Sequence, residues 1–181
     1  MVHPQHRSLN IMMINGYRFG EECVEEMVNW ALKYVPPSSS PRILEVGSGN
    51  GTLLFALLDA EYQPERLYGI DYSPGSIKLA RSIAIPRGGD SISFKLCDIL
   101  KEDPSTMSSM SQENGFGWDL ILDKGTFDAI ALGVAPFDGY PSKIARMLKP
   151  GAYFLITCTF FFFFPKIDIL NILVICSMQF H

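Results

Sequence analysis

Residues 42–51 read Arg-Ile-Leu-Glu-Val-Gly-Ser-Gly-Asn-Gly, and this stretch decides the fold that we expect. Ile43, Leu44 and Val46 are apolar residues of the kind that a strand covered on both faces requires. Residues 52–58 are then densely apolar, as in a packed helix. Three glycines lie between, and glycine tolerates the positive φ angles that let a ligand approach backbone N–H groups at the start of a helix. The stretch therefore predicts a buried strand, a ligand-binding loop and a helix.

The spacing of the glycines distinguishes between two kinds of ligand. Gly47, Gly49 and Gly51 form G-x-G-x-G, whereas the dinucleotide fingerprint is G-x-G-x-x-G. Glu45 precedes the loop, and a carboxylate there suits a cationic or zwitterionic ligand better than a phosphate. These four residues together resemble the first motif of the class I, or seven-strand, S-adenosylmethionine-dependent methyltransferases. The resemblance implies that they hold the amino-acid end of S-adenosylmethionine; a glycine-rich turn without a ligand is the alternative for the triplet alone.

Two further predicted strands end in acids. Residues 67–71 form one, and its last residue, Asp71, lies 20 residues after Gly51, near the distance at which a carboxylate meets ribose hydroxyls. Residues 92–98 form the other, which ends in Asp98. An aspartate at a strand end can also simply cap a turn. The resemblance implies that the adenosine part of the cofactor is bound by Asp71, Tyr72, Asp98 and Ile99.

The segment from Asp123 to Ile130 follows a fourth predicted strand, residues 118–123. It resembles the motif of the protein-lysine methyltransferases that modify translation elongation factor 1-alpha, and residues 19–21 match the N-terminal segment of the same subfamily. The resemblance implies that Asp123, which also borders the cofactor, orients the substrate lysine and that Phe127 excludes water or contacts the cation. It implies a substrate-binding rim formed by Tyr17, Phe19, Lys124, Gly125 and Thr126. A non-catalytic cofactor-binding form and a small-molecule methyltransferase are the alternatives.

Composition excludes several other classes of protein. The chain has 181 residues, of which 48% are hydrophobic and 19% charged, as expected for one globular domain. A net charge of −4 argues against nonspecific nucleic-acid binding, which needs clustered Lys and Arg. The four widely spaced cysteines and the terminal histidines fit neither a metal site nor a disulfide framework. We therefore expect no metal, and reduced thiols in a cytoplasmic, possibly also nuclear, protein.

The alternation of strands and helices predicts an open, mostly parallel, Rossmann-like α/β sheet with its ligand at the carboxyl ends of the strands. Helices are expected at residues 17–34 and 137–147, and a further strand at residues 152–157 after a Lys-Pro-Gly turn. The predicted divisions are a flexible tail (1–16), a methyltransferase domain (17–158) and a divergent apolar tail (159–181).

The apolar tail departs from the family pattern. Residues 160–164 are five phenylalanines, and Pro165, Lys166 and Asp168 interrupt the apolar stretch that follows. Only ~10 continuous apolar residues remain against the ~20 that a membrane span needs, so membrane association is not expected. We expect the sheet to lack the last helix and antiparallel edge strands of the family. Strand 152–157 would then be unpaired at one edge and could recruit other chains into oligomers or aggregates.

Overall fold

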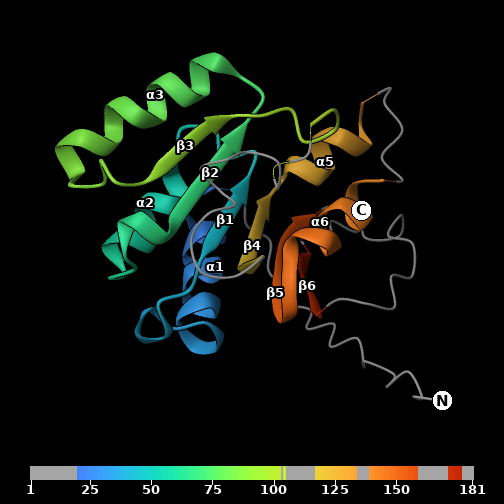
Figure 1. The fold of residues 1–181 in the computed structure, drawn as a ribbon, viewed down its shortest axis with the longest axis horizontal. Helices are drawn as coiled ribbons and strands as arrows, with labels where there is room; N and C mark the ends of the chain where they lie inside the picture. Colours follow the sequence, from blue (N-terminus) through green and yellow to red (C-terminus); the bar gives the residue numbers. More distant parts are fainter. Residues whose placement is uncertain (1–19, 103, 105–116, 134–138, 159–170, 177–181) are drawn as a thin grey trace.

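The computed structural model describes residues 20–102, 104, 117–133, 139–158 and 171–176 (Figure 1). The helices are α1 (Glu21–Tyr34), α2 (Thr52–Asp59), α3 (Pro74–Ala84), α5 (Thr126–Ala131) and α6 (Tyr140–Met147), with 3₁₀ turns at Pro37–Ser39, Pro64–Arg66 and Ile85–Arg87. The strands are β1 (Ile43–Val46), β2 (Leu67–Asp71), β3 (Ser93–Leu96), β4 (Trp118–Lys124), β5 (Leu148–Cys158) and β6 (Asn171–Cys176).

The strands form one sheet in the order β3-β2-β1-β4-β5-β6, and each neighbouring pair is parallel. The chain builds β1, β2 and β3 outward in one direction and then returns to add β4, β5 and β6 on the other side of β1. The order therefore reverses between β1 and β4, which is where open α/β sheets bind ligands. Val46 lies opposite both Ile70 and Asp123, so the carboxyl ends of β1, β2 and β4 meet at one edge. The predicted Rossmann-like architecture is confirmed.

Two hydrophobic cores cover the two faces of the sheet. Helices α1, α2 and α3 pack on one face, and α5 and α6 on the other (Figure 1). Successive strand residues alternate between the cores: Leu120 and Leu122 face the first, whereas Ile121 faces the second. All three are fully buried. Burial on both faces explains why these strands read as continuous apolar runs in the sequence.

Local sequence features explain how α3 begins and how α1 packs. Ser73 caps α3, because its Oγ accepts a hydrogen bond from the Ser76 N–H at 3.3 Å, and Pro74 occupies the first helical position. Helix α1 buries Met27 and Ala31 in the first core, whereas Leu32, which we also expected on the apolar face, is 40% exposed. It begins at Glu21, and the proposed earlier start at Tyr17 lies outside the described residues.

Strand β5 starts earlier than predicted. It begins at Leu148, before the Lys-Pro-Gly sequence that we expected to form a separate turn. Trp118 faces Leu148 and Leu120 faces Tyr153, so two residue steps along β4 match five along β5. The surplus forms a bulge, in which Gly151 takes a φ of +83°. The Lys-Pro-Gly sequence does form a local irregularity, but it lies within β5 because residues on both sides of it pair with β4.

The prediction of an unpaired edge at β5 is wrong. Strand β6 pairs in parallel with β5, from Tyr153 opposite Asn171 to Cys158 opposite Cys176. Residues 171–176, which we expected to belong to an unpaired tail, therefore supply the backbone hydrogen-bond partner of β5. No antiparallel strand occurs within the described part of the chain, and the phenylalanine run 160–164 lies outside it. None of the described helices is long and apolar enough to cross a membrane.

Candidate functional site

The glycine loop joins β1 to α2 at the carboxyl edge of the sheet. Gly47, Gly49 and Gly51 have φ angles of +68°, +54° and +85°, which disfavour any side chain. A Cβ on Gly47 would lie 1.9 Å from the Thr126 Oγ1, whereas a Cβ on Gly49 would meet no described heavy atom within 4 Å. The first glycine is thus required for packing. The second borders open space from which a ligand can reach the backbone.

Glu45 lies on β1 directly before this loop and is 2% exposed. The Leu54 backbone hydrogen-bonds the carboxyl group, but Oε2 has no hydrogen-bond partner among the residues that the structure describes. The pKa of Glu45 is raised to about 8, chiefly by burial; Lys124 opposes this shift, and Asp123 and Asp71 contribute to it. A buried carboxyl oxygen without a partner needs an explanation, and a bound donor or cation at the loop supplies one.

Asp71 joins the glycine loop to the turn after β2. Its Oδ2 accepts a hydrogen bond from the Gly49 N–H at 2.9 Å, and its Oδ1 accepts one from the Ser73 N–H at 2.8 Å. The side chain is 8% exposed, whereas the neighbouring Tyr72 is 77% exposed. A carboxylate has about four acceptor sites, so Asp71 keeps capacity for hydroxyl groups. The structure thus places two of the predicted cofactor-binding residues, Asp71 and Gly49, side by side.

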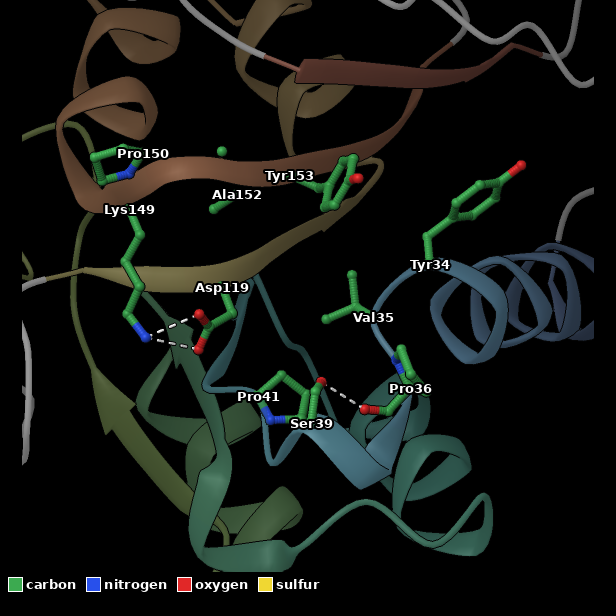
Figure 2. A pocket seen from close by; sticks show the side chains of 11 residues that line it. Tyr34, Val35, Pro36, Ser39, Pro41, Asp119, Lys149, Pro150, Ala152 and Tyr153 are labelled. Carbon is green, nitrogen blue, oxygen red and sulfur yellow. Dashed lines mark hydrogen bonds and ion pairs between the residues drawn. The ribbon is translucent and has the colours of Figure 1, made fainter.

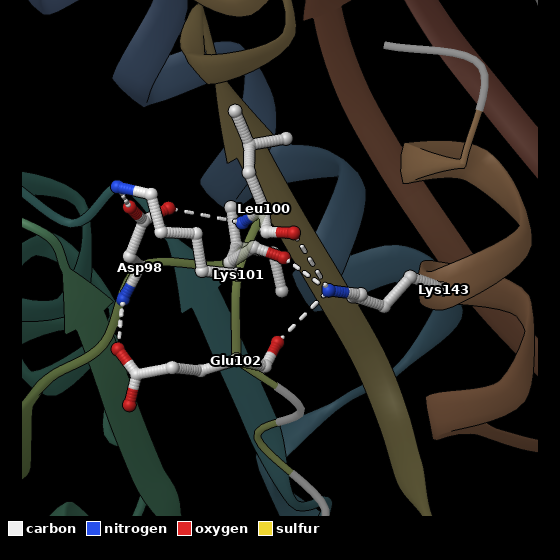
Figure 3. A network of polar contacts seen from close by, with 6 residues as sticks. Asp98, Leu100, Lys101, Glu102 and Lys143 are labelled. Carbon is white, nitrogen blue, oxygen red and sulfur yellow. Dashed lines mark hydrogen bonds and ion pairs between the residues drawn. The ribbon is translucent and has the colours of Figure 1, made fainter. Parts of the chain in front are cut away.

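Asp98 organises the turn that follows β3, which Figure 3 shows. Its Oδ1 accepts from the Leu100 N–H at 3.1 Å, and its Oδ2 pairs with the Lys101 ammonium at 2.8 Å. The hydrogen bond from Lys101 is the main cause that lowers the pKa of Asp98. The Asp98 N–H donates to Glu102 Oε1 at 2.8 Å, and Ile99 is buried. Asp98 therefore shapes its own turn, in line with the simpler alternative, and the adenine contact stays a prediction.

Asp123 ends up in the interior. It is fully buried, and its carboxylate accepts hydrogen bonds from the Tyr140 hydroxyl at 2.6 Å, the Thr126 N–H at 2.7 Å and the Phe127 N–H at 3.1 Å. Burial raises the pKa of Asp123 to about 7 despite these bonds. Phe127 is also fully buried, with its ring centroid 6.0 Å from that of Tyr140.

These positions correct the expected rim. Asp123 caps the first turn of α5, and Phe127 fills the core beneath it, so both have internal partners where a substrate lysine was expected. Neither side chain can touch a substrate without opening this packing. In this structure both are positioning residues for the edge of the site, and direct catalytic contact is not supported by their geometry.

The remaining rim residues hold β4 against β1. Thr126 donates from its Oγ1 to the Val46 carbonyl at 2.8 Å, and Gly125 takes a φ of +83° immediately before α5. Lys124 and Thr126 are half-buried. Tyr17 and Phe19, the other two predicted rim residues, lie outside the described residues.

Sequence reasoning missed two polar residues of α6. Tyr140 binds Asp123, and Lys143 binds backbone carbonyls of the turn after β3. Both contacts join segments far apart in the sequence, and no local motif announces them. The sequence shows only that Tyr140 and Lys143 are three residues apart, a spacing that places two side chains on the same side of a helix.

A cavity of about 320 Å³ lies at the opposite edge of the sheet, and none of the predicted site residues lines it (Figure 2). Its polar side is an ion pair: the Lys149 Nζ lies 2.8 and 2.9 Å from the two carboxylate oxygens of Asp119. The Arg42 N–H also donates to Asp119, at 2.8 Å, which holds the β5 bulge against β1. We therefore assign the functional site to the glycine-loop edge.

No group of three or more metal-binding side chains occurs in the described ranges.

The glycine loop and the buried acids lie at the ends of adjacent parallel strands. A match to a known family covers these same elements. A family described as "Methyltransferase domain" matches residues 37–160, about two thirds of the chain. The chain belongs to this methyltransferase family. Its loop, switch point and strand order are therefore those of a methyltransferase domain.

Curated relatives narrow the comparison. The chain is 40% identical over 157 residues to protein-lysine N-methyltransferase efm4 of Schizosaccharomyces pombe, covering 77% of this chain and 63% of the relative. It is 36% identical over 143 residues to EEF1A lysine methyltransferase 2 of Homo sapiens, covering 77% of this chain and 56% of the relative. The methyltransferase chain thus spans less than two thirds of the length of these relatives.

Solved structures agree on the fold. The glycopeptide N-methyltransferase MtfA, solved with S-adenosyl-L-methionine, superposes with a TM-score of 0.56 at 18% identity, over 74% of this chain and 53% of that chain. The YcgJ protein of Bacillus subtilis gives a TM-score of 0.56 at 19% identity, over 76% of this chain and 50% of that chain. At such identities the likeness shows the methyltransferase fold alone.

Proposed function

We propose that this methyltransferase uses S-adenosylmethionine to methylate a lysine of a protein substrate, and that the substrate is translation elongation factor 1-alpha. The buried Glu45 carboxyl, with one oxygen left without a described partner beside a positive-φ glycine loop, carries the proposal. The relatives at 40% and 36% identity, one of them named for EEF1A, support the substrate class.

The residues present fit the cofactor. Glu45 offers its open Oε2 to the ammonium of the amino-acid end, and Gly49 leaves space against the backbone. Asp71, at the end of β2, has acceptor capacity for ribose hydroxyls, and the turn at Asp98 follows β3, the next strand along the same edge, where adenine would extend. The proposed cofactor-binding residues are Glu45, Gly47, Gly49, Gly51, Asp71, Tyr72, Asp98, Ile99 and, through its capping role, Asp123.

When bound, S-adenosylmethionine supplies a methyl group already activated by its sulfonium. The chain's main task is then to align the neutral lysine amine with that methyl group, and such positioning provides a large share of the rate. Asp123 is held by three donors inside the protein and serves orientation rather than proton removal. Nearby carboxyl groups favour the ammonium form of lysine, so solvent takes the proton before transfer.

We also propose a cytoplasmic or nuclear location, consistent with the buried thiol of Cys23.

Transfer of a labelled methyl group tests the function. Incubation with labelled S-adenosylmethionine and purified elongation factor 1-alpha should label one lysine, identified by mass spectrometry. The Gly49→Ala variant, which blocks the cofactor space, serves as the inactive control. Cofactor binding without transfer would instead support the non-catalytic alternative, and label in a low-molecular-weight fraction would support a small-molecule substrate.

The affinity for S-adenosylhomocysteine should rise with pH. Without ligand, Glu45 has a pKa of about 8 and is mostly protonated at neutral pH. The ligand ammonium favours the carboxylate, so binding releases a proton wherever the pH lies below that pKa, and affinity increases until about pH 8. Release of one proton from a group with a pKa of about 8 predicts a gain of roughly fiftyfold between about pH 6 and pH 8.

Calorimetry in two buffers of different ionisation enthalpy measures both the affinity and the released proton. Glu45→Gln should bind more weakly and without this pH dependence. 5′-Methylthioadenosine, which lacks the amino-acid end, should bind the wild-type protein with nearly constant affinity. An equal pH slope in wild type and Glu45→Gln would remove Glu45 from the site.

A further inference from the structure

The ammonium of Lys143 lies against three backbone carbonyls of the turn after β3, as Figure 3 shows. Its Nζ is 2.6 Å from the Ile99 oxygen, 2.9 Å from the Glu102 oxygen and 3.4 Å from the Leu100 oxygen. An ammonium has three donors and no acceptor, so three carbonyls match its capacity. Hydrogen bonds from a charged donor are stronger than those between neutral groups. Lys143 therefore acts as a clamp on this turn.

Apart from Lys143, the contacts of this turn given above are local ones among residues 98–102. The N–H groups of Lys101 and Glu102 both donate to the Asp98 carbonyl, at 2.9 and 2.8 Å, which makes residues 98–102 a single helical turn. One turn is too short to be stable alone, because nucleating a helix is unfavourable. Within this turn Ile99 is buried, whereas Leu100, Lys101 and Glu102 are exposed. The carbonyl end of a helical turn carries partial negative charge, which the Lys143 ammonium offsets.

Helix α6 applies the clamp from a fixed position. Ile144 and Met147 anchor the helix in the second core, at 0% and 4% exposure. Tyr140 lies three residues before Lys143, on the same side of the helix, and its hydroxyl binds Asp123 at the end of β4. One helix therefore holds both the turn after β3 and the end of β4, which flank the glycine loop in the strand order β3-β2-β1-β4.

We propose that Lys143 is a positioning residue for the adenine end of the cofactor site. It holds residues 98–102 so that Asp98 and Ile99 face the adenine ring, and it makes no contact with the cofactor itself. The inference rests on the cofactor site of the proposed function. Loss of the clamp should raise the KM for S-adenosylmethionine and leave kcat unchanged, since the acceptor side of the site is held separately through Tyr140.

Calorimetry with two probes tests the inference. Lys143→Met should weaken S-adenosylhomocysteine and 5′-methylthioadenosine by the same factor, roughly tenfold, as expected for the loss of a charge-assisted contact. Lys143→Arg retains a cation with several donors and should stay within about threefold of wild type. Lys78→Met removes the same charge from an exposed position of α3 and should change neither affinity. Glu45→Gln should weaken only the probe that carries the amino-acid end.

The outcomes separate this inference from the function on which it rests. Wild-type protein that binds neither probe would overturn both. Wild-type binding with an unchanged affinity of Lys143→Met for 5′-methylthioadenosine would overturn only the role of Lys143, as would a fall in kcat at constant KM. Should Lys143→Met lack a cooperative melting transition, Lys143→Gln, which keeps one donor group, takes its place with the same expected direction.

Discussion

Gly49→Ala is expected to weaken cofactor binding at least about a hundredfold, whereas Gly88→Ala should leave it unchanged. The two glycines are matched in backbone conformation, with φ angles of +54° and +69°. Neither added Cβ would meet a described heavy atom within 4 Å. Both substitutions therefore carry the same strain, about 1 kcal/mol for a non-glycine residue in this region. Only their positions differ, because Gly49 borders Asp71 and Gly88 follows a 3₁₀ turn after α3.

The difference in affinity between the two variants separates steric exclusion of the ligand from backbone strain. At Gly49 the added methyl group enters the space that the ligand needs, and the shifted backbone also weakens the 2.9 Å hydrogen bond from its N–H to Asp71. Calorimetry with S-adenosylhomocysteine measures the affinity, and thermal unfolding without ligand measures the shared strain. Similar melting temperatures with unequal affinities are the expected result. Equal affinities would place the ligand away from the glycine loop.

Features set by neighbouring residues could be predicted from the sequence. The glycine loop, Asp71 at the end of β2 and the Ser73 cap of α3 all depend on patterns within a few positions. The position of Asp71 at the same edge as the glycine loop also followed, because parallel strands bring their carboxyl ends to one edge.

Features set by distant partners could not. Asp123 has the sequence context of a rim residue, and only Tyr140, 17 positions later, reveals that its carboxylate faces inward. The clamp from Lys143 to Ile99 spans 44 positions. The pairing of β6 with β5 likewise depends on where the chain returns after its crossover, which the apolar composition of residues 171–176 does not specify. Hydrophobic pattern predicts which elements form, whereas polar contacts between elements need the assembled fold.

Asp123→Ala is expected to lower the free energy of unfolding by about 3 kcal/mol, since it leaves three buried donors without their acceptor. These donors are the Tyr140 hydroxyl and the N–H groups of Thr126 and Phe127. Asp123→Asn keeps the shape and an acceptor oxygen for the N–H groups, so its effect at about pH 8 should be small. Tyr140→Phe removes one of the three bonds and should cost about 1 kcal/mol.

The pH dependence identifies the carboxyl group itself. Its pKa is about 7 in the folded protein, raised from 3.8, so its stabilising contribution is fully present below about pH 4 and is lost as the pH rises to 7. Asparagine does not titrate, and the other ionisable groups are common to both proteins. Wild type should therefore lose stability relative to Asp123→Asn between about pH 4 and pH 7. Urea unfolding at several pH values measures this difference; a constant gap between the two proteins would show that the Asp123 carboxyl has an ordinary pKa and is open to solvent, as the rim role requires.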